Sequence, residues 1–75
     1  MDYMKKLLVQ SVVWKEEGQF VAQCLSIDVS SFGKTKEEAL RSLDEALSLY
    51  FEDASPKEIL KIQGIEIEPR IVKYA

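Results

Sequence analysis

The sequence predicts an α+β domain: a three-stranded antiparallel meander, one main amphipathic helix packed on one sheet face, a short second helix and a fourth, C-terminal strand. Two alternating apolar segments flank a turn at residues 15–18, and a third short segment ends at Gly33. Apolar residues then recur with a helical period up to residue 53. At 75 residues the chain is expected to form a single domain, residues 1–75. On folding, a chain of this length buries only about 60% of the surface that the unfolded chain exposes. An oligomer or a partner would therefore add stability.

The first two strands are predicted to form a hairpin. Residues 7–14 alternate and are rich in valine, Lys-Glu-Glu-Gly forms the turn, and residues 20–25 return. Matching side chains across the pair places Val13 opposite Phe20 and Gln10 opposite Gln23. One face then carries small or apolar residues, namely Val9, Ser11, Val13, Phe20, Ala22 and Cys24. The other face carries Leu8, Val12, Trp14, Val21 and Leu25 around the two glutamines.

The third strand, residues 29–32, leads through Gly33 and Lys34 into the helix. Thr35 and Glu38 form a T-x-x-E capping box at the helix start, and loss of the Thr35 hydroxyl should cost about 1 kcal/mol. The apolar stripe of this helix comprises Ala39, Leu40, Leu43, Ala46, Leu47, Tyr50 and Phe51. We expect this stripe to pack on the face that holds Cys24, with the thiol buried as a small apolar group.

Two further elements are expected after the main helix. Ser55 suits an N-cap, Pro56 the first helical position and Glu58 the third, which predicts a short helix that ends before Gly64. Residues 65–68 alternate again and predict a strand continuing to residue 73. Pro69 removes one amide donor, which suits an edge strand or a bulge.

One main helix can cover only one face of the sheet, so the other face needs a different explanation. We expect an interface there, either between copies of the chain or with a partner, because exposed apolar patches usually mark contacts. The residues assigned to this interface are Leu8, Val12, Trp14, Val21, Leu25 and Leu49. In the alternative, the short helix folds under the sheet and Leu49 packs at the margin of the core.

The residue content argues against an enzyme. The chain has no histidine and one cysteine, so its serines have no imidazole base and no intrachain disulfide can form. The acidic clusters include Glu37-Glu38 and Asp44-Glu45. Glu37, Asp44 and Glu45 fall on the polar side of the helix, where carboxylates usually serve solubility. The three glycines form no phosphate loop. We therefore expect no catalytic residue, no cofactor and no metal site.

The charge and the N-terminal sequence restrict the partners. A net charge of −3 disfavours direct nucleic-acid binding, which usually requires a surplus of lysine and arginine. The N-terminal apolar run is too short for a membrane span and lacks a signal-peptide cleavage site. A cytoplasmic protein is the expectation.

Four motifs occur in order between residues 12 and 52: G-x-F-V-A-x-C, a short strand ending in glycine, T-x-E-E-A-L, and E-A-L-x-L-Y-F-E. Together they resemble the HicB-like antitoxin family. The resemblance implies a partial ribonuclease H-like fold (β-β-β-α-β) without nuclease carboxylates. It also implies that the chain acts as the antitoxin of a type II toxin-antitoxin pair, binding a small, basic, RNA-cleaving HicA-like toxin.

The resemblance also implies a homodimer or a homotetramer. Many members of the HicB-like family carry a C-terminal DNA-binding module, but the last predicted strand here is followed directly by Ala75, so operator binding is not expected. The alternative function is a solitary oligomeric module of the same fold that binds a small ligand or an unrelated protein. A neighbouring reading frame for a short, lysine-rich protein with one histidine would favour the antitoxin.

Overall fold

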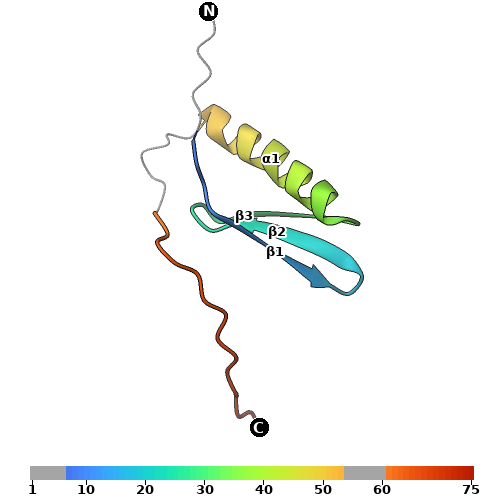
Figure 1. Ribbon diagram of the computed structural model, residues 1–75, viewed down its shortest axis with the longest axis vertical. Coiled ribbons are helices and arrows are strands. Elements are labelled where there is room, and N and C mark those ends of the chain that lie inside the picture. Colours follow the sequence, from blue (N-terminus) through green and yellow to red (C-terminus); the bar gives the residue numbers. More distant parts are fainter. Residues whose placement is uncertain (1–6, 54–60) are drawn as a thin grey trace, which may run out of the picture.

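The computed structural model, which describes residues 7–53 and 61–75, contains an antiparallel sheet and one helix laid across it (Figure 1). The strands are β1 (Ser11–Glu16), β2 (Gln19–Cys24) and β3 (Val29–Gly33), and they neighbour one another in that order. The helix, α1, follows β3 directly and spans Lys36–Asp53. The predicted meander followed by a main helix on one sheet face is thus confirmed.

The β1–β2 hairpin is closed by a two-residue turn at Glu17 and Gly18. Both residues have positive φ angles, 48° and 80°, which is the signature of a type I′ turn, whose twist matches that of the flanking strands. Val13 therefore lies opposite Ala22 rather than Phe20, so the predicted register is wrong. The reason is the turn, which contains two residues instead of four. Since the pairing shifts by two positions, each side chain keeps its predicted face.

The core lies between α1 and the inner face of the sheet. Ala22 and Cys24 of β2 are fully buried there, and Ala39, Leu43 and Leu47 of α1 are buried against them. The burial of Cys24 is confirmed, as is the apolar stripe at these three helix positions. Leu43 is among the largest fully buried side chains of the described residues, and the removal of such a side chain from water is worth about 2 kcal/mol.

The junction between β3 and α1 depends on Gly33 and Thr35. The amide of Glu38 donates to Thr35 Oγ1 at 3.1 Å, which is the predicted N-cap bond. The amide of Ala39 donates to the Thr35 carbonyl at 3.0 Å and starts the helical ladder. A Cβ added to Gly33 would lie 2.6 Å from the Ala39 nitrogen, closer than such atoms approach. Glycine at this position therefore allows β3 to pass directly beneath the first turn of α1.

The predicted fourth strand is absent, and the fold of the described residues is β-β-β-α rather than β-β-β-α-β. Residues 61–75, which we term the C-terminal segment, form neither helix nor strand. They run outside the body formed by the sheet and α1 (Figure 1). The alternating sequence gives strand propensity, but a strand also needs a ladder partner, and the segment pairs with none of the three strands in the described part of the chain. The predicted helix start at Ser55 lies outside the described residues, and the positions from 61 to 64 are not helical.

Candidate interaction surface

The outer face of the sheet is the face that α1 does not cover. Strand alternation places eight side chains on it: Val12, Trp14 and Glu16 from β1, Gln19, Val21 and Gln23 from β2, and Ser30 and Phe32 from β3. The register brings Trp14 opposite Val21, and Val21 opposite Phe32. These three residues form an apolar row across the sheet, which we term the Trp14 row.

The Trp14 row is open to solvent. Trp14 is 38% exposed and Phe32 is 66% exposed, while Val21 between them is half-buried. Large aromatic side chains left in water on so small a domain are typical of contact surfaces, where they contribute most of the binding energy.

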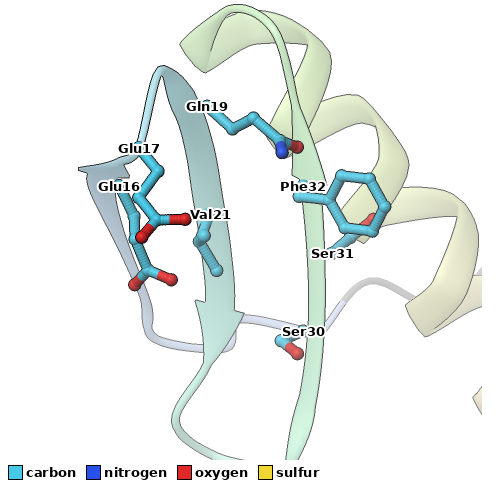
Figure 2. Close-up of a pocket in the computed structure, with 7 residues that line it drawn as sticks. All are labelled: Glu16, Glu17, Gln19, Val21, Ser30, Ser31 and Phe32. Atoms are coloured by element: carbon cyan, nitrogen blue, oxygen red, sulfur yellow. The ribbon is translucent and has the colours of Figure 1, made fainter.

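Acidic residues border the row at the hairpin end. The Trp14 indole Nε1 donates to Glu16 Oε1 at 2.9 Å, which ties the indole to a carboxylate. Glu16, Glu17, Val21 and Phe32 are among the residues that line an open hollow of about 370 Å³. Figure 2 shows the two glutamates at one side of this hollow and the Phe32 ring at the other. The surface is therefore apolar at its centre and anionic at its rim, which suits an apolar side chain flanked by lysine or arginine.

The structure brings three of the six predicted interface residues together on the outer face: Val12, Trp14 and Val21. Val12 is half-buried and lies opposite Gln23, two positions before Trp14 on the same face of β1. Gln10, expected to pair with Gln23, instead accepts a hydrogen bond at its carbonyl from the Leu25 amide, at 2.7 Å.

The other three predicted residues lie away from the Trp14 row. Leu8 is exposed in the segment before β1, and Leu25 is half-buried in the turn after β2. Leu49 lies on α1, which packs against the opposite face of the sheet (Figure 1). Because Leu49 is 65% exposed, it does not pack at the core margin, as the alternative reading required.

Phe32 was not among the predicted interface residues. A signal for it exists in the sequence V-S-S-F-G of β3. Gly33 is buried where β3 meets α1. Because side chains alternate along a strand, Phe32, the residue before Gly33, then points to the outer face. The exposure of Phe32 is therefore predictable once β3 is given an inner and an outer face.

The described residues hold no group of three or more histidine, cysteine, aspartate or glutamate side chains placed to bind a metal ion. Ser26 is the buried polar residue of this part of the chain, and its Oγ accepts a hydrogen bond from the Gln10 amide at 3.3 Å. No helix within residues 7–53 and 61–75 has the length and apolar character needed to cross a membrane.

These features define a small β-β-β-α domain with an exposed, acid-rimmed apolar sheet face. The chain belongs to DUF7387, a family of unknown function, whose family model matches residues 9–73. The matched span includes the sheet, α1 and most of the C-terminal segment. No curated protein and no solved structure matches the chain.

Proposed function

We propose that this chain is the antitoxin of a type II toxin-antitoxin pair, and that it neutralises a small, basic, RNA-cleaving HicA-like toxin by direct binding. The observation that carries the proposal is the Trp14 row with its rim of Glu16 and Glu17. Neutralisation by binding requires a surface and no chemistry of its own, which is in keeping with the residue content of the chain.

Charge supports a basic partner. The chain has a net charge of −3, and a basic protein would approach it under a favourable field. The rim glutamates would then pair with lysine or arginine while the aromatic side chains lose water, an arrangement typical of energetic centres in interfaces. Binding to nucleic acid is not part of the proposal, because the outer strand positions carry no lysine or arginine.

The motifs between residues 12 and 52 support this choice of partner through their resemblance to HicB-like antitoxins. The DUF7387 assignment adds no activity, since the family is one of unknown function. The proposal places the chain in the cytoplasm, where an RNA-cleaving toxin acts.

The second candidate is a solitary oligomeric module that binds a small ligand or an unrelated protein. The observation that favours it is the open hollow beside Phe32, which has apolar walls at Val21 and Phe32 and polar ones at Gln19 and Ser30. This candidate needs no toxin gene beside the gene for the chain.

The test is purification of the tagged full chain from its native cells, followed by a toxicity assay of what co-purifies. We expect one small basic protein in near-equal amount, which arrests growth and cleaves RNA when produced alone and does neither when produced with the chain. Trp14→Glu should abolish both its recovery and the protection, because it replaces an aromatic side chain of the Trp14 row by a charge.

Leu49→Glu is the matched control, since it adds the same charge at an exposed position on α1. It should retain full recovery and protection. Recovery of a partner that does not cleave RNA, or of the chain alone, would reject the antitoxin and favour the solitary module. If Trp14→Glu and Leu49→Glu lost partner recovery and protection to the same extent, the Trp14 row would have no special part in binding.

A further inference from the structure

We propose that in the free protein the Trp14 row is covered by the C-terminal segment of a second copy, through residues 70–74, and that each copy of a twofold dimer gives its segment to the other. This goes beyond the antitoxin proposal and does not depend on it, because it concerns the purified chain alone.

Several apolar side chains of the C-terminal segment are exposed. Ile71 is 96% exposed and Tyr74 is 95% exposed, and Val72 between them is also exposed. The family model extends through residue 73, so the segment is part of the domain that defines the family. If both this segment and the Trp14 row stayed in water, one small chain would carry two uncovered apolar surfaces.

The charges of the two surfaces are complementary. Residues 70–74 contain Arg70 and Lys73 and no acidic residue, although the chain as a whole is acidic. The outer strand positions contain Glu16 and no basic residue, and Glu17 in the adjacent turn adds a second carboxylate. A stretch with apolar side chains and two basic residues therefore meets an apolar row that has two acidic residues at its hairpin end.

The dimensions also match. Five extended residues span roughly 17 Å, while three strands spaced by about 4.8 Å place the outer two only about 10 Å apart. A five-residue stretch can thus reach across the whole Trp14 row. Side chains alternate along an extended stretch, so Val72 and Tyr74 share one side and are the apolar anchors.

A second copy supplies the segment because a single chain leaves both surfaces exposed. The segment lies outside the body of the sheet and helix in the isolated chain (Figure 1). In a twofold dimer each copy offers one segment and one face, so the exchange closes without an unpaired surface. It also adds buried area to a chain too short to bury much alone. Any other protein that uses the Trp14 row must then displace this segment.

Trp14 is the only tryptophan of the chain, so its fluorescence reports on the outer face. The experiment measures sedimentation equilibrium and acrylamide quenching of the full-length chain over one dilution series. We expect a monomer–dimer equilibrium in which the Trp14 emission shifts to the blue and the quenching falls in step with dimer formation.

The key variant is Val72→Asp, which should weaken the dimer by roughly tenfold or more, because two charges would be buried per twofold dimer. Arg70→Glu with Lys73→Glu should weaken it as well, since it sets like charges against Glu16 and Glu17. Leu49→Asp, the control on α1, should leave the dimer and the Trp14 emission unchanged. Circular dichroism verifies that each variant keeps its helix.

Three results would overturn the inference. The first is a monomer at every concentration with Trp14 open to acrylamide. The second is a monomer whose Trp14 is shielded and becomes open in Val72→Asp, which would mean that the segment folds onto its own chain. The third is a dimer that Val72→Asp leaves intact, which would place the dimer contact elsewhere.

Discussion

Replacement of Gly33 by alanine should destabilise the fold more than its single methyl group suggests. The added Cβ would lie 2.6 Å from the Ala39 nitrogen and 2.9 Å from the Glu38 carbonyl carbon. Both are backbone atoms of the first turn of α1, so no rotation of a side chain can relieve the contact. Either β3 or the start of α1 must move.

The expected cost follows from the atoms that must shift. Overpacking of a close-packed interior costs about 1–3 kcal/mol, and a clash with backbone belongs at the upper end of that range. A domain of this length has a free energy of unfolding of roughly 4–11 kcal/mol. We therefore expect Gly33→Ala to remove about 2–3 kcal/mol and to lower the Tm by roughly 10–20 °C.

Urea unfolding followed by helical circular dichroism measures this change, and the other glycines provide two matched controls. Gly64→Ala meets no atom within 4 Å and should leave the free energy of unfolding unchanged. Gly18→Ala also meets no atom, but its φ of +80° is left-handed, so it should cost about 1 kcal/mol from backbone strain alone. If Gly33→Ala costs no more than Gly64→Ala, the close approach of β3 to α1 is not as described.

Three further substitutions test the core, the helix start and the outer face. Leu43→Ala should lower the free energy of unfolding by about 3 kcal/mol because Leu43 is fully buried, and a loss below 1 kcal/mol in urea unfolding would contradict that burial. Thr35→Ala should cost about 1 kcal/mol through loss of the bond to the Glu38 amide, whereas Thr35→Ser should retain most of the stability in the same assay. Phe32→Ser should cost less than about 1 kcal/mol, since the ring is exposed, and yet it should remove partner recovery in the co-purification; a large loss of stability would mean that the ring packs in the core.

Periodicity made the helix and the faces of the hairpin predictable from the sequence. A side chain's face depends only on alternation along its own strand, so Cys24 and Val21 were assigned correctly even though the pairing was not. The capping box at Thr35 likewise depends on residues three apart, and its first bond is present.

The register and the C-terminal segment were less predictable because they depend on more than one stretch of the chain. Side-chain matching gave no reason to prefer a left-handed Glu17, yet Glu17 and Gly18 close a two-residue turn. Apolar and polar residues alternate in residues 65–73 as they do in a strand, but this pattern does not depend on whether a partner strand is present. Phe32 was missed for a related reason, since its exposure follows from the contact between Gly33 and α1.

The most direct test of the outer face as a binding surface is nuclear magnetic resonance of the isotope-labelled chain, titrated with the basic protein that co-purifies with it. We predict that the Trp14 indole resonance and the amides of Val21 and Phe32 change most, while the amide of Leu49 on α1 stays in place. Changes that gather on α1 and leave the Trp14 indole unmoved would contradict the account, because the partner would then bind the opposite side of the molecule.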